Sequence, residues 1–247
     1  MGYEQLEEPL VVQPVSQSFS RSESYYWENI VVQVEDTLFR FPKHHLMRKS
    51  EVFRSMLSMP QGKSEPEGVS DDHPIKLWGV SKIELERLLQ VLHPIDAQKQ
   101  PQLSMDAWLS VSKLSGLWRL ADTRNIAISG LTTLMWKIDP VDRVILGRRY
   151  SVAQWLSSGF MDLVHRVEMV SEEEAEKIGL DTALQIQRVR ETFLRTAYKI
   201  EQSNNRYSYQ GNATEPSYDR DNVKNAVEKT FKKELEDTEA DGASFNE

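Results

Sequence analysis

Cysteine is absent from this chain of 247 residues. Its absence excludes disulfides, thiol catalysis and cysteine-ligated zinc, and it fits a reducing compartment. No uncharged apolar run approaches the roughly 18 residues of a membrane-spanning helix, so we expect no membrane span. Positive charge is also scarce, because 30 Lys and Arg stand against 38 Asp and Glu, for a net charge of -8. That balance disfavours a general nucleic-acid binder.

The short motifs of common enzymes are missing as well. None of the 11 glycines is spaced as GxG, which excludes a dinucleotide fingerprint, and no GxSxG elbow is present. Among the five histidines no HxxxH spacing occurs. His44 and His45 are adjacent and would point about 100° apart on a helix, so they do not chelate one ion together. We therefore predict no catalytic, metal-binding or cofactor-binding residues; an enzyme would need a polar cleft that the sequence does not locate.

Several charged and aromatic features have structural interpretations. Glu172, Glu173 and Glu174 follow Ser171, which is the pattern of a capping box in the first turn of a helix. The basic pairs in the chain are best explained as solvated faces. The six tryptophans lie mostly at helical-core spacing, so we assign them to packing.

The first ordered elements are expected near residue 25. A β-branched run from Ile30 to Val34, the acidic pair Glu35-Asp36 and a second apolar run predict two short strands joined by a tight turn. Pro42 ends the second strand. The apolar spacing over residues 44–57 then predicts two short helices, the second capped by Ser50.

A third strand and a series of helices are predicted downstream. The segment IKLWGV is a short strand, and Ser81 caps the helix that follows. Two largely apolar helices fill residues 104–136. Asp139-Pro140 and Ser151 each start a further helix, and Asp181 caps a longer one that ends near residue 200.

Both ends of the chain have little periodicity. We expect residues 1–24 to be flexible, and their acidic character does not fit a secretory signal. Residues 203–247 are expected to be a mostly disordered acidic tail. A single short amphipathic helix is possible there, because apolar residues recur every four positions at Val223, Val227, Phe231 and Leu235.

This order of elements resembles the BTB/POZ domain. The segments RFPKHHLMRKSEVFRSML, LWGVS and WLSVSKLSGLWRLADTRNIAISGL are most similar to BTB proteins that are numerous in mushroom-forming fungi. The resemblance covers residues 25–137, and residues 138–202 resemble the helical extension of those proteins. The residues that carry the pattern are Val34, Phe39, Leu46, Ser50, Val52, Phe53, Met56 and Leu57.

The resemblance implies an α+β fold with a small three-stranded sheet, a flanking cluster of helices and an all-helical C-terminal extension. It also implies a non-enzymatic scaffold in the cytoplasm, the nucleus or both, which binds proteins and forms a homodimer. Two alternatives stay open: a substrate adaptor of a cullin-type ubiquitin ligase, and a transcription-linked corepressor platform.

The candidate site residues follow from the same resemblance. The candidate self-association face comprises Tyr25, Tyr26, Trp27, Lys43, Met47 and Ser50. The charged pocket of many dimeric members is weakened, because its positions correspond to Asn29, Pro42 and Lys43. The candidate partner loop contains Met59 and Gln61. Cullin binding is disfavoured, because Gln61 stands where cullin-binding members often have Glu, and Leu92-His93-Pro94 replaces their aromatic at the helix end.

Overall fold

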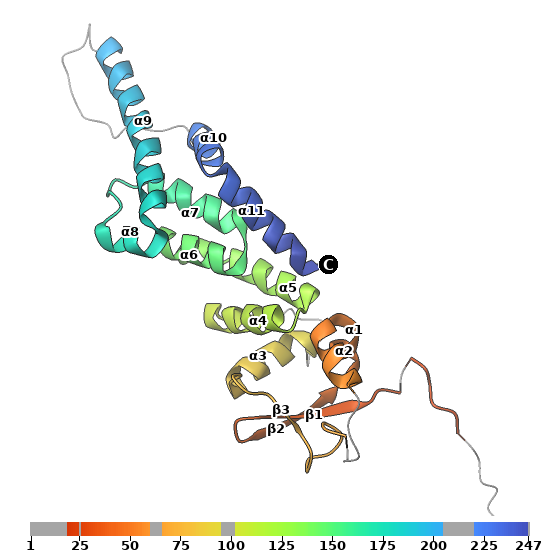
Figure 1. The fold of residues 1–247 in the computed structure, drawn as a ribbon. Helices are drawn as coiled ribbons and strands as arrows, with labels where there is room; N and C mark the ends of the chain where they lie inside the picture. Colours follow the sequence, from red (N-terminus) through yellow and green to blue (C-terminus); the bar gives the residue numbers. More distant parts are fainter. Residues whose placement is uncertain (1–18, 25, 60–65, 95–101, 205–219, 247) are drawn as a thin grey trace, which may run out of the picture.

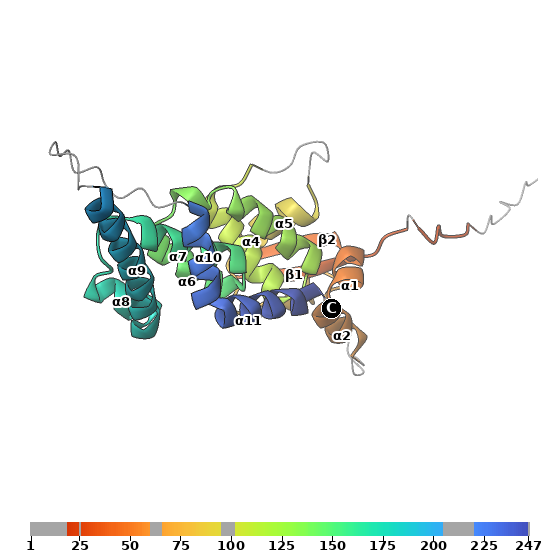
Figure 2. The same cartoon turned by 90° about the horizontal axis from the view of Figure 1, so that it is seen from above.

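A small sheet and a longer series of helices make up the chain (Figure 1). The computed structural model describes residues 19–24, 26–59, 66–94, 102–204 and 220–246. The fold is mixed α+β and mostly helical, in agreement with the expected class. Seen from above, the sheet with α1 and α2 lies at one end, and α8 and α9 lie at the other (Figure 2).

The predicted hairpin is confirmed. β1 (Asn29–Val34) pairs antiparallel with β2 (Thr37–Pro42), and Val34 stands opposite Thr37. The turn between them places Glu35 in the left-handed region, with φ of 54°. The tight acidic turn therefore brings together two strands whose apolar residues reach the core.

The third strand is shorter than expected. β3 (Ile75–Lys76) pairs in parallel with β1, which gives the strand order β2-β1-β3. Gly79, with φ of 75°, ends the extended segment two residues after Leu77. Because the chain turns there, Trp78 is left 85% exposed.

Two short helices follow the hairpin, as predicted. α1 (His44–Lys49) and α2 (Glu51–Ser58) share Ser50, which ends the first and caps the second. The Ser50 hydroxyl oxygen accepts a hydrogen bond from the Phe53 amide at 3.1 Å. The cap turns the chain sharply enough for Leu46 and Phe53 to enter one core.

The first core lies between the sheet and α3 (Lys82–Leu92), α4 (Met105–Leu117) and α5 (Ala121–Thr132). Ser81 and Glu84 form the capping box at the start of α3. α4 is buried on most of its circumference, as its apolar sequence predicts.

The helical extension follows a short 3-10 turn, η1 (Met135–Lys137). Asp139 caps its first helix, as predicted, whereas Ser151 ends that helix in a left-handed conformation, with φ of 52°, and does not start the next one. Ser171 forms the predicted capping box. The helices of the extension are α6 (Pro140–Tyr150), α7 (Ala153–His165), α8 (Glu172–Ile178) and α9 (Leu180–Asn204).

The expectation of a mostly disordered tail is wrong for residues 220–246. Two helices, α10 (Arg220–Thr230) and α11 (Lys232–Ala243), are followed by the 3-10 turn η2 (Ser244–Asn246). Val223, Val227 and Phe231 are buried in a second core that α7 and α9 share. The four-residue apolar repeat is therefore a packed stripe, and α11 runs back along the molecule until its end lies near α5 (Figures 1 and 2).

Other expectations about the termini fall outside the described residues. Residues 1–18, which are most of the segment predicted to be flexible, lie outside them. Residues 205–219, which belong to the segment predicted to be disordered, lie outside them as well. Residues 19–24 are exposed and lead away from the body (Figure 1). Within the described parts of the chain, no helix has the length and apolar character needed to span a membrane.

Candidate interaction face

The residues just before β1 form an exposed aromatic pair next to α1. The Trp27 ring stacks on the His44 imidazole, with ring centroids 4.7 Å apart, and its indole nitrogen donates a hydrogen bond to the Ser24 carbonyl at 2.9 Å. The Arg21 guanidinium lies 4.7 Å from the centre of the Tyr26 ring. Despite these contacts, Tyr26 is 56% exposed and Trp27 is 53% exposed.

A charged pair fixes the chain at this point. The Lys43 ammonium contacts the Glu28 carboxylate, and the Lys43 amide donates to the Glu28 carbonyl at 2.9 Å. The hydrogen bond from Lys43 lowers the pKa of Glu28. Both side chains face solvent, so this ion pair orients the segment more than it stabilises the fold.

Only part of the surface of α1 is exposed to solvent. Leu46 is buried in the first core, as expected, and Met47 is half-buried at the edge of the exposed face. The Arg54 side chain donates to the carbonyls of Met47 at 3.2 Å and Arg48 at 3.3 Å. These bonds satisfy carbonyls at the end of a six-residue helix and hold α1 against α2.

Ser50 does not belong to the exposed face on which it was expected. Its side chain is fully buried, and its hydroxyl donates to the Trp118 carbonyl at 2.5 Å. Because the same oxygen caps α2, Ser50 links α2 to the end of α4. The described exposed face is therefore Tyr26 and Trp27, bordered by Lys43 and Met47, while Tyr25 lies outside the described residues.

The candidate partner loop is described at one residue only. Met59 follows α2 and is 63% exposed. Gln61 lies outside the described residues, so its position relative to Met59 stays a prediction.

Over the residues with described positions, no group of three or more His, Asp or Glu is placed to hold a metal ion. The features that the face does present are two exposed aromatic rings and one ion pair. These features are suited to contact with another protein.

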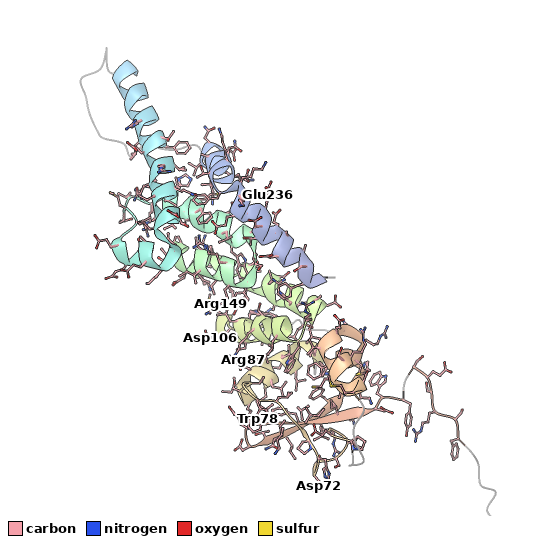
Figure 3. The ribbon with its side chains drawn as sticks, viewed as in Figure 1. Asp72, Trp78, Arg87, Asp106, Arg149 and Glu236 are labelled. Atoms are coloured by element: carbon pink, nitrogen blue, oxygen red, sulfur yellow. The ribbon has the colours of Figure 1, made fainter. Side chains whose placement is uncertain are left out.

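Sequence reasoning placed too many tryptophans in the core. Trp108, Trp118 and Trp155 are buried, but Trp78 and Trp136 are more than half exposed. Trp27 is also exposed, as its place in the candidate self-association face predicts. For Trp78 the signal was the following Gly79, since a turn residue after a two-residue strand carries its neighbour to the surface. Figure 3 shows Trp78 beside the sheet.

Comparison of the chain with known protein families, curated proteins and solved structures found no significant match.

Proposed function

We propose that this protein is a non-enzymatic interaction scaffold of the BTB/POZ type, active in the cytoplasm or nucleus, that self-associates through Tyr26, Trp27 and the adjoining part of α1. The observation that carries the proposal is the exposed aromatic pair next to β1 and α1. An apolar patch held in place by specific contacts and left open to solvent is a usual mark of an interface.

The connectivity of the first half supports the same proposal. A hairpin, two short helices, a strand parallel to the first one and a set of helices follow one another in the order expected for the BTB/POZ resemblance. The described segment 19–24 leads away from the body (Figure 1), and the side chains of Tyr26 and Trp27 stay more than half exposed in the folded chain. The face is thus available to a second copy, and two-fold symmetry is the default.

Sedimentation equilibrium of the full chain tests self-association. The unsubstituted protein should dimerise at tens of micromolar, and Trp27→Glu should raise the dimer dissociation constant by about 30-fold, since a Trp hot spot contributes about 2 kcal/mol or more. Trp136→Glu is the matched control, because Trp136 is 74% exposed on η1 and the substitution is identical.

Two results would contradict this function. A monomer at tens of micromolar in the unsubstituted protein would remove the self-association. A dimer weakened equally by Trp27→Glu and Trp136→Glu would place the contact elsewhere.

A cullin-adaptor role is the second candidate, and the exposed Met59 after α2 is the observation that favours it. We nevertheless expect weak binding, because an amide in place of the family's Glu at position 61 removes a charge. A purified cullin N-terminal domain should not bind the chain at submicromolar affinity in calorimetry. Gln61→Glu should strengthen any binding that is seen, and tight binding by the unsubstituted chain would make the adaptor role the better proposal.

A further inference from the structure

A cavity of about 640 Å³ opens where α4, α5, α6 and η2 meet. Three of its lining side chains are bases and none is an acid, which is unusual in a chain of net charge -8. Figure 3 labels Arg149, which belongs to α6 on the side of α4. The lining residues that matter are Ser112, Lys113, Arg124, Arg149, Tyr150 and Phe245.

Arg124 is a buried cation whose contacts are neutral. It is only 4% exposed, one of its nitrogens donates to the Tyr150 carbonyl, and the Phe245 ring lies 4.2 Å from its guanidinium. Burial lowers the pKa of Arg124. Among the described residues no carboxylate is paired with it. A buried guanidinium without a counter-ion is costly, so the cavity is electrostatically suited to an anion.

Ser112 supplies a second unsatisfied group in the same cavity. Its side chain is 2% exposed, and its hydroxyl has no hydrogen-bond partner. Arg149 is exposed and forms no ion pair within the described part of the chain. Lys113 is already paired with Glu84 at 2.6 Å. The free donors are therefore the hydroxyl of Ser112 and the guanidinium of Arg149.

The chain itself places a peptide segment over this cavity. A Cβ at Gly242 would lie 2.6 Å from the Ser151 carbonyl oxygen, so only glycine lets α11 pass this closely over the α6–α7 turn. The close approach directs η2 toward α5 and sets Phe245 at the cavity wall. An aromatic side chain on a short peptide segment thus already fits beside Arg124.

We propose that this cavity binds a peptide segment of a partner protein that carries a carboxylate or a phosphate next to a bulky apolar side chain. The anionic group would be held by Arg149 and Ser112 in the field of Arg124, and the apolar group would pack on Leu117 and Phe245. The site goes beyond the self-association proposed above, because it is built from α4, α5, α6 and η2. It shares no residue with the exposed face formed by Tyr26 and Trp27.

Calorimetry on the full chain tests the proposal with three small probes: phenyl phosphate, phenylacetate and the neutral benzyl alcohol. At least one of the two anions should bind, and benzyl alcohol should not. Whichever anion binds more tightly identifies phosphate or carboxylate as the recognised group. Arg149→Gln should weaken that binding by about tenfold or more, since it removes a charge-assisted hydrogen bond. Arg188→Gln is the matched control, because Arg188 is an exposed arginine on α9, outside the cavity.

Ser112→Ala separates a binding role from a structural one. Its hydroxyl has no partner in the free chain, so the unfolding temperature should stay unchanged or rise, while affinity for the anion falls. Failure of both anions to bind at about 10 mM would overturn the proposal. Equal affinity in Arg149→Gln and Arg188→Gln would also overturn it. Trp27→Glu should bind the anion as the unsubstituted chain does, so the two proposals fail separately.

Discussion

Replacing Phe231 by alanine should lower the free energy of unfolding by about 3–5 kcal/mol, the usual cost of removing a buried Phe side chain. Phe231 is 3% exposed, and its ring stacks on Phe160 with centroids 4.0 Å apart and planes 17° from parallel. The substitution would leave a void between α7 and the start of α11, lined by Phe160 and by the rest of the second core.

Phe19→Ala is the control for that experiment. The chemical change is the same, but Phe19 is 86% exposed and should alter stability by less than about 0.5 kcal/mol. Urea denaturation of the full chain, followed by far-ultraviolet circular dichroism, measures both. If Phe231→Ala were as harmless as Phe19→Ala, α10 and α11 would not be docked in solution, and the disordered tail expected from sequence would be correct.

The packing of the tail could not be predicted from its own sequence. The four-residue repeat in residues 223–235 was recognised, but an amphipathic helix is stable only when another surface covers its apolar stripe. That surface lies on α7, far earlier in the chain, where Leu156, Phe160 and Leu163 are buried in the second core. The apolar surface of α7 is wide, because Trp155 packs in the first core and Phe160 packs in the second. The width of this apolar surface was the signal in the sequence that a further helix covers α7.

Local features were predicted well because they depend on neighbouring residues. The hairpin, the Ser50 cap, the capping boxes at Ser81 and Ser171 and the Asp139 cap each need only a few consecutive positions. Ser151 was assigned wrongly because serine favours a helix start, whereas here it closes α6 in a left-handed conformation.

Residues of the candidate sites were likewise placed correctly where neighbouring residues decide their position, and incorrectly where distant contacts decide it. Exposure of Tyr26 and Trp27 followed from their place before the first strand. Ser50 was misplaced because its hydroxyl bonds to Trp118, a residue far along the chain. The cavity that contains Arg124 and Ser112 combines three helices and η2, so its charge depends on distant contacts that periodicity does not reveal.

Asp162→Asn should destabilise the chain by about 3 kcal/mol. The Asp162 carboxylate lies 2.6 Å from the Arg143 guanidinium and ties α7 to α6. The Arg143 side chain is 8% exposed, and among the described residues its guanidinium also donates to the Ile138 carbonyl at 3.0 Å. Removal of the negative charge leaves a buried cation without compensation. The expected cost lies at the low end of about 3–5 kcal/mol for such a change, because Asp162 is itself 40% exposed.

A double-mutant cycle distinguishes this charge effect from a loss of packing. Arg143→Met keeps most of the apolar stem and removes the cation, so Arg143→Met combined with Asp162→Asn should recover most of the lost stability. Asp122→Asn is the matched control, because the Lys49–Asp122 pair at 2.7 Å has side chains 41% and 67% exposed and contributes under about 1 kcal/mol. Thermal and urea unfolding of the four proteins measure the coupling. Additive effects of the two substitutions would mean that the Arg143–Asp162 pair does not hold α6 and α7 together.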